Sequence, residues 1–124
     1  MDLVVLAGFM RILSPFFIRK FKNRILNIHP ALLPAFKGAY AIKDAFHYGV
    51  KVTGVTVHFV DEKVDHGPIL IQEPVTILEN ESVGELEARI HKIEHRIYPE
   101  AIKSVLSGRF LLKGRRIIPG IPAA

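Results

Sequence analysis

The sequence contains no cysteine and no tryptophan. Without cysteine, a disulfide framework, a thiolate metal site and a cysteine nucleophile are all excluded. No apolar run approaches the roughly 20 residues that a membrane-spanning helix needs. The first residues also lack the basic, apolar and small-residue regions of a secretory signal. We therefore expect a cytoplasmic protein that does not associate with membranes.

Acidic residues are fewer than basic ones, 12 against 17, which leaves a net charge of +5. A basic surface attracts anions such as nucleic acids or phosphorylated small molecules. The basic residues are not interleaved with aromatic ones, so we expect small-molecule substrates and no nucleic acid. The glycines form neither a G-x-G-x-x-G fingerprint nor a P-loop, so the sequence shows no Gly-rich phosphate loop.

The 124 residues, 49% hydrophobic and 23% charged, suffice for one globular domain or part of one. The apolar run Leu3–Ala7 is typical of a strand buried on both faces, and Ile25–Ile28 reads as a second buried strand. Their alternation with helical segments predicts an α/β fold, a mostly parallel sheet with flanking helices, over residues 1–118, followed by an irregular tail over 119–124. The other expected elements are helices over 15–21, 39–48 and 83–108, strands over 52–60 and 69–77, and a hairpin over 110–118.

Local signals support these boundaries. Ser14-Pro15 and the capping box Ser82-Val83-Gly84-Glu85 each predict a helix start. Pro74 indicates that the end of its strand lies at a sheet edge, and Pro99 is expected to kink the long helix.

Asn27 and His29 stand at the end of the second strand, because Pro30 lacks the donor that would continue a ladder. Strand alternation puts both side chains on the same side. An amide beside an imidazole suits the stabilisation of an oxyanion and the movement of a proton. The plainer interpretation is an Asn that caps a turn and a His bonded to backbone. These residues alone leave both interpretations open.

The segment Asn27-Ile28-His29-Pro30-Ala31-Leu32-Leu33-Pro34, followed by Gly38, resembles the folate-dependent formyltransferases, specifically those that formylate glycinamide ribonucleotide (GAR transformylases). The segment from Val57 to Pro68 is similar to that family's second signature. The resemblance extends from Asp2 to the helix that ends near Gly108. It implies a formyltransferase-like, Rossmann-like fold. It also implies transfer of a formyl group from 10-formyltetrahydrofolate to the amine of glycinamide ribonucleotide in de novo purine biosynthesis.

The resemblance adds Asp65 to Asn27 and His29 as the third catalytic residue. Taken alone, an Asp before Gly67-Pro68 is a turn residue. In the implied mechanism the amine attacks the formyl carbon, and Asn27 and a protonated His29 hold the oxyanion. Asp65 stabilises the imidazolium and helps to relay a proton to the departing folate nitrogen. No metal is required.

The resemblance also implies the binding residues. It assigns substrate contacts to Asn27, Ile28, Pro30 and Glu94, with Glu94 on the ribose hydroxyls. The two walls of the folate pocket would comprise Met10, Arg11, Ile12 and Leu13 on one side, and Val60, Asp61, Glu62, Lys63, Val64 and Asp65 on the other.

Glu94 also belongs to His91-Lys92-Ile93-Glu94-His95, which matches the inverted zinc-hydrolase pattern H-x-x-E-H. His91 and His95 lie one helical turn apart and could share a metal. A zinc hydrolase needs a third ligand, and Glu100 is the only carboxylate further along the chain. We therefore expect no metal at this cluster.

Members of the resembled family begin with a further βαβ half that carries the substrate phosphate site, whereas this sequence begins at what would be a central strand. A fragment, one half of a split enzyme and a non-catalytic remnant are all compatible with that start. A non-enzyme alternative is an assembly module that pairs through the strand edge at Leu3–Ala7, with itself or with a separate N-terminal half. Because the sequence lacks the phosphate-binding half, we also expect the chain alone to be an oligomer with little or no transferase activity, although its catalytic residues remain.

Two enzymatic relatives remain as alternatives. Formyltetrahydrofolate hydrolase is disfavoured by Pro30, where we expect a second His. Methionyl-tRNA formyltransferase is disfavoured by the short C-terminal segment.

Overall fold

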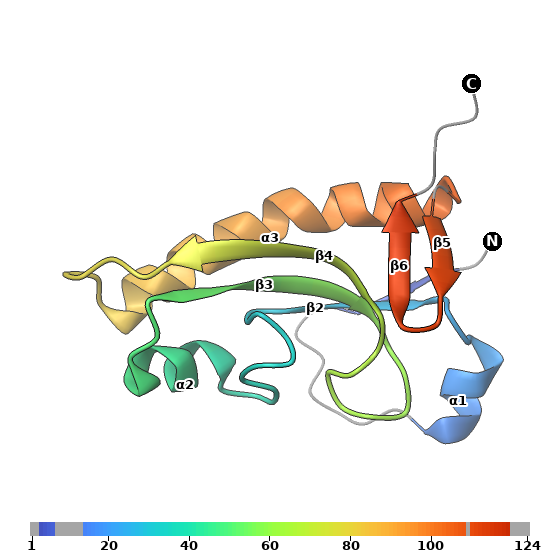
Figure 1. The fold of residues 1–124 in the computed structure, drawn as a ribbon, viewed down its shortest axis with the longest axis horizontal. Helices are drawn as coiled ribbons and strands as arrows, with labels where there is room; N and C mark the ends of the chain where they lie inside the picture. The colour runs from blue at the N-terminus through green and yellow to red at the C-terminus, as the bar shows by residue number, and fades with distance from the viewer. Residues whose placement is uncertain (1–2, 7–13, 109, 120–124) are drawn as a thin grey trace.

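The computed structural model describes residues 3–6, 14–108 and 110–119. One six-stranded sheet, in the order β1-β2-β3-β4-β6-β5, carries helices packed around it (Figure 1). The α/β fold class is confirmed. The elements are β1 (Val4–Val5), α1 (Pro15–Lys20), β2 (Ile25–His29), α2 (Ala41–Tyr48), β3 (Val52–Phe59), β4 (Ile69–Thr76), α3 (Val83–Leu106), β5 (Phe110–Lys113) and β6 (Arg116–Pro119).

The sheet is mixed, so the expectation of a mostly parallel sheet is wrong for the described residues. Only β1–β2 and the single β4–β6 register pair are parallel. The pairs β2–β3, β3–β4 and β5–β6 are antiparallel. The connections after β3 and β5 contain no crossover helix, and strands joined in that way run antiparallel.

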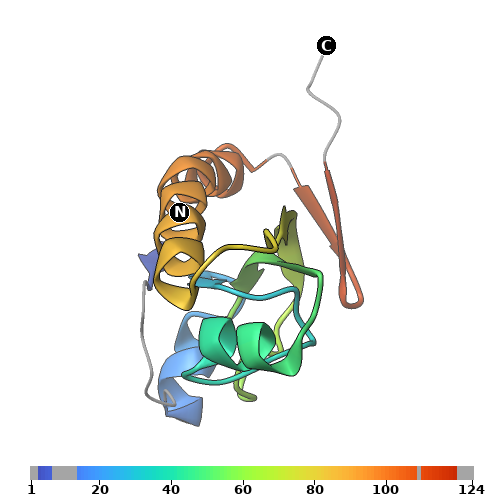
Figure 2. The same cartoon turned by 90° about the vertical axis from the view of Figure 1, so that its left-hand side faces the viewer.

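Helix α3 supplies much of the core (Figure 2). Its buried residues recur at helical spacing and pack against β2, β3 and β4. The predicted capping box is present: Glu85 N donates to Ser82 Oγ over 3.1 Å, and Ser82 N donates to Glu85 Oε1 over 3.2 Å. The helix is one element across Pro99. Its buried residues are Leu86, Ile90, Ile97, Tyr98, Ala101 and Val105.

Strand β1 differs from its prediction. It comprises Val4–Val5 within the described segment 3–6, and Val5 is 42% exposed, so the strand is not buried on both faces. In the described residues β1 pairs only with β2, which leaves it at the sheet edge. The Tyr98 hydroxyl donates to the carbonyl groups of Leu6 and Leu26, and burial raises the pKa of Tyr98. The hydroxyl therefore stays a donor that joins α3 to both strands.

The β5–β6 hairpin confirms the prediction for this region, although Pro119 lies in β6 and not in an irregular tail. The hairpin joins the sheet at Ile69↔Arg116, and the rings of Phe110 and Phe59 lie 5.5 Å apart. Because β6 pairs with β4 only there, Pro74 further along β4 lies at an edge, as predicted. Among the described residues, no helix is long and apolar enough to cross a membrane.

Candidate active site

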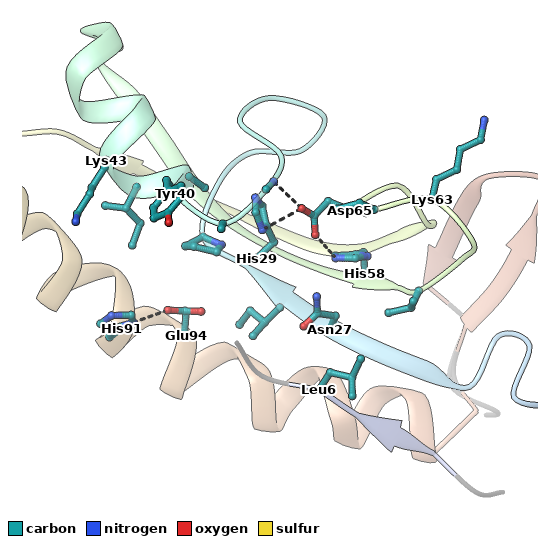
Figure 3. Close-up of a pocket in the computed structure, with 18 of the residues that line it drawn as sticks. Leu6, Asn27, His29, Tyr40, Lys43, His58, Lys63, Asp65, His91 and Glu94 are labelled. Carbon is teal, nitrogen blue, oxygen red and sulfur yellow. Dashed lines mark hydrogen bonds and ion pairs between the residues drawn. The ribbon is translucent and has the colours of Figure 1, made fainter. Parts of the chain in front are cut away.

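A pocket of about 450 Å³ lies at the end of β2, between α2, α3 and the loop that joins β3 to β4 (Figure 3). That size is within the roughly 300–1,000 Å³ of small-molecule sites. Asn27 and His29 reach it from β2, and Asp65 reaches it from the β3–β4 loop. The sequence placed the first two on one side of their strand, and the fold brings Asp65 to the same pocket.

His29 is buried and held between two partners. Its Nε2–H donates to the Phe36 carbonyl oxygen over 2.8 Å, and its Nδ1 lies 3.6 Å from Asp65 Oδ2. With Nε2 protonated, a proton on Nδ1 makes the ring a cation. Asp65 is the carboxylate placed to stabilise that cation, since both side chains are largely withdrawn from water.

Asp65 holds an uncommon backbone conformation. Its φ is 49°, in the left-handed region that residues with a Cβ seldom occupy. Its Oδ2 accepts a hydrogen bond from Gly38 N over 2.8 Å. The following Gly67 is required by packing, because a Cβ there would lie 1.7 Å from the Phe59 carbonyl oxygen. These contacts maintain the strained turn that directs Asp65 toward His29.

His58 lies beside the same carboxylate. Its Nδ1–H donates to the Phe59 carbonyl oxygen over 2.9 Å, and its Nε2 is 3.9 Å from Asp65 Oδ1. Burial lowers the pKa of His58, so the ring is neutral at neutral pH. Within the described part of the chain, this buried Nε2 has no hydrogen-bond partner. His58 also lines the pocket.

The Asn27 side chain points into the pocket with an unsatisfied oxygen. The residue is 9% exposed, and its Oδ1 has no hydrogen-bond partner among the described residues. A buried acceptor without a donor costs about 1–3 kcal/mol. A ligand that brings an N–H or O–H group to Asn27 would recover that free energy.

Comparison with known proteins identifies the architecture. The family model described as formyl transferase matches residues 1–102. The chain belongs to the formyl transferase family. It is 48% identical over 105 residues to phosphoribosylglycinamide formyltransferase of Bacillus subtilis, covering 85% of this chain and 54% of that protein.

Two solved structures extend the comparison. Glycinamide ribonucleotide transformylase 1 from Symbiobacterium toebii superposes with a TM-score of 0.92 at 52% identity, covering 97% of this chain and 57% of that one. A formyltetrahydrofolate deformylase from Pseudomonas syringae pv. tomato is more distant in sequence, with 32% identity and a TM-score of 0.90, covering 97% of this chain and 40% of that one. The chain spans about half the length of the transferases that it matches.

In this formyl transferase chain the expected binding residues fall into two groups. The first group lines the pocket together with Asn27, His29 and His58, and it comprises Ile28, Pro30, Glu94 and all of Val60–Asp65. The other expected wall, Met10, Arg11, Ile12 and Leu13, lies outside the described residues.

The far end of the pocket is polar and includes residues that sequence reasoning missed. Tyr40, the N-cap residue of α2, and Lys43 within α2 line it (Figure 3). Glu87 of α3 lines it as well. Glu87, His91 and Glu94 recur at helical spacing, so one face of α3 borders the pocket. That periodicity was the signal available for Glu87, because it shares a face with Glu94.

Two residues of the H-x-x-E-H segment are hydrogen-bonded to each other beside the pocket. His91 Nδ1 lies 2.8 Å from Glu94 Oε1, and the Glu94 side chain is 15% exposed. Among the described residues, no three His, Cys, Asp or Glu side chains are grouped so as to hold a metal. The absence of a metal stays a prediction.

Proposed function

We propose that this chain carries the reaction centre for formyl transfer from 10-formyltetrahydrofolate to the amine of glycinamide ribonucleotide, in purine biosynthesis. One observation carries the proposal: Asp65 faces the buried His29 at 3.6 Å in a pocket that Asn27 also lines. The comparisons support the reaction class, because the similar proteins named above include phosphoribosylglycinamide formyltransferases.

The proposed reaction begins when the amine nitrogen attacks the formyl carbon. A C–N bond forms, and the π electrons of the carbonyl group move to its oxygen, which becomes an oxyanion. Asn27 and protonated His29 stabilise that charge, and Asp65 stabilises the imidazolium. Loss of one such oxyanion donor typically lowers the rate about 10²–10³-fold.

The tetrahedral intermediate then collapses. The carbonyl group re-forms and the bond to the folate nitrogen breaks. The attacking nitrogen loses a proton and the departing nitrogen gains one, so the reaction is balanced without a metal or redox partner. Asp65 and His29 are the groups that we assign to this proton relay.

The two substrates are proposed to occupy different parts of the pocket. Reduced folate would lie along the loop Val60–Asp65, with Met10–Leu13 as its other wall. Glycinamide ribonucleotide would contact Asn27, Ile28 and Pro30, and Glu94 would accept hydrogen bonds from its ribose hydroxyls. The Glu94 side chain is only 15% exposed and is hydrogen-bonded to His91, which supports a fixed orientation of the carboxylate for such contacts.

The partners of the chain are also proposals. We infer that it works in the cytoplasm either with a second copy of itself or with a separate polypeptide that supplies an N-terminal half. Sedimentation of the purified chain, with and without such a polypeptide, separates these arrangements. A chain that sediments as a monomer in both mixtures would contradict both.

A second candidate is hydrolysis of formyltetrahydrofolate, in which water replaces the amine. The likeness to a deformylase structure favours it. Pro30, where the hydrolase resemblance leads us to expect a His, argues against it.

Product analysis tests both candidates. The chain is incubated with 10-formyltetrahydrofolate in the presence and absence of glycinamide ribonucleotide, with a candidate N-terminal half added in parallel. We expect formylated ribonucleotide only when the amine is present. Formate released at the same rate in both samples would show that the reaction is hydrolysis and not transfer. No product under any condition would contradict both candidate functions.

A further inference from the structure

The loop that carries Asp65 is contacted from outside by the tip of the β5–β6 hairpin. Arg115 lies in the hairpin turn, and its Nη2 donates to the carbonyl oxygen of His66. Its Nη1 lies 3.3 and 3.4 Å from the two ring nitrogens of His66. Because Nδ1 carries its proton toward Asp61, Nε2 is the ring nitrogen that can accept from Arg115. The guanidinium thus contacts both the backbone and the ring of the residue that follows Asp65. Arg115 lies beyond residue 102, where the match to the family model ends.

The contact continues through His66 into the loop. The His66 Nδ1–H donates to Asp61 Oδ2 over 2.7 Å, and Asp61 Oδ1 accepts from Lys63 N over 2.9 Å. The side chains of His66 and Asp61 are only 33% and 36% exposed. Arg115, His66 and Asp61 thus form a polar cluster, hereafter the loop clamp, that links the hairpin to the start of the pocket wall.

The hairpin is itself held in place, because it contacts the residues at both ends of the β3–β4 loop. Phe110 stacks against Phe59, which immediately precedes the loop, with ring centroids 5.5 Å apart. Arg116 pairs with Ile69, the first residue of β4 after the loop. A second contact to the loop, Arg19–Glu62 at 3.9 Å, joins two exposed side chains and contributes little.

Asp65 needs such support because its φ of 49° is unfavourable for a residue with a Cβ. The Gly38 amide holds its carboxylate on one side. Arg115 holds the carbonyl group of the next residue on the other side. With one of these supports removed, the peptide between Asp65 and Gly67 can relax toward commoner backbone angles, and the carboxylate turns with it.

We propose that Arg115 is a positioning residue, which acts through the loop clamp to hold Asp65 opposite His29. Its consequence for formyl transfer rests on the proposed function, but the geometric role does not. The variant Arg115→Gln removes the charge and the fork of donors. Arg115→Lys retains the charge but cannot hold the carbonyl oxygen and the ring together. Arg116→Gln is the matched control: the same charge is lost, and the Arg116 side chain makes no hydrogen bond or ion pair among the described residues, since Arg116 pairs through its backbone only.

Two backbone amides report on the loop without any ligand or activity. Gly38 N–H donates to Asp65 Oδ2, and Lys63 N–H donates to Asp61 Oδ1. In NMR spectra of the full chain, we expect Arg115→Gln to move the Gly38 amide proton upfield. We also expect hydrogen exchange of both amides to become roughly fivefold faster, the loss expected for one ordinary hydrogen bond. Arg115→Lys should fall between wild type and Arg115→Gln, and Arg116→Gln should match wild type.

Formyl transfer provides the second readout. If transfer occurs, Arg115→Gln should lower kcat with little change in KM for the ribonucleotide, because Asp65 acts on the imidazolium and not on ribose. We expect Arg115→Gln to melt at the same temperature as Arg116→Gln. Equal melting temperatures would show that the lower kcat comes from the position of Asp65 and not from general destabilisation.

The outcomes are distinct. Gly38 and Lys63 signals that are unchanged in Arg115→Gln, or changed equally in Arg116→Gln, would overturn the proposal. If the amides respond but wild type transfers no formyl group even with the N-terminal half added, the proposed function fails while the positioning role stands.

Discussion

Asp65 Oδ2 faces His29 Nδ1 at 3.6 Å and also accepts the Gly38 amide at 2.8 Å. One carboxylate oxygen thus joins the end of β2, the loop before α2 and the loop after β3. The three segments that border the pocket are coupled through a single side chain. A change at Asp65 should therefore alter the geometry of the pocket around His29.

The first prediction concerns Asp65→Asn. The amide can still accept from Gly38 N, but it cannot stabilise a positive charge on His29. We expect transfer to fall about 10²-fold or more, within the range for loss of acid–base assistance, with little change in melting temperature. Steady-state kinetics and thermal melting measure the two effects. Asp44→Asn on the exposed side of α2 is the charge-matched control. An equal loss of rate in that control would contradict the catalytic role assigned to Asp65.

Asn27→Ala is expected to separate activity from stability. The Asn27 Oδ1 is buried and has no hydrogen-bond partner among the described residues. Truncation to Ala therefore breaks no hydrogen bond that this oxygen accepts. We expect kcat to fall about 10²–10³-fold, as for loss of an oxyanion donor. The melting temperature should stay the same or rise. A lower melting temperature with normal kcat would show that the residue is structural.

His58 should make stability depend on pH. Burial lowers its pKa in the folded state below the ordinary value of 6.5, so the unfolded chain binds the proton more readily. The stability tied to neutral His58 is therefore present above pH 6.5 and declines as the pH falls from there toward the lowered pKa. Urea unfolding between pH 5 and 8 should show a smaller decline in His58→Gln than in wild type. Parallel curves for the two proteins would contradict this.

Two glycine substitutions should have opposite effects. Gly67→Ala would put a Cβ 1.7 Å from the Phe59 carbonyl oxygen, a backbone atom that cannot move aside cheaply. We expect a loss of several kcal/mol, in the range of about 3–5 for severe core disruption. Gly84→Ala in the first turn of α3 meets nothing closer than 3.9 Å and should gain about 0.5–1 kcal/mol. Denaturant midpoints compare the pair directly, and equal shifts would refute the packing argument.

The histidines of α3 are expected to hold no zinc. The ring of His91 is already paired with Glu94, and no third ligand is grouped with them among the described residues. Elemental analysis of protein purified without chelator should show less than stoichiometric zinc. Stoichiometric zinc that is lost in His95→Ala would instead revive a metal-dependent hydrolase.

Features that depend only on neighbouring residues could be predicted from the sequence. The two-residue period of a strand put Asn27 and His29 on one side, and Pro30 ended the strand after them. Ser82 and Glu85 predicted the start of α3, since a capping box forms within one helical turn. The resemblance to formyltransferase motifs around Asn27 and Asp65 could also be recognised in the sequence, because the residues of each motif are contiguous.

How these segments meet follows from long-range packing, which the structure reveals. No local pattern predicted that β3 runs antiparallel to β2, since strands read alike in both directions. The fold alone brings Asp65 to His29, surrounds His58 with the pocket, and lets Arg115 reach His66 from a hairpin far along the chain. Such contacts are set by how the sheet and α3 pack together, and that packing is distributed over the whole core instead of being encoded at any one site.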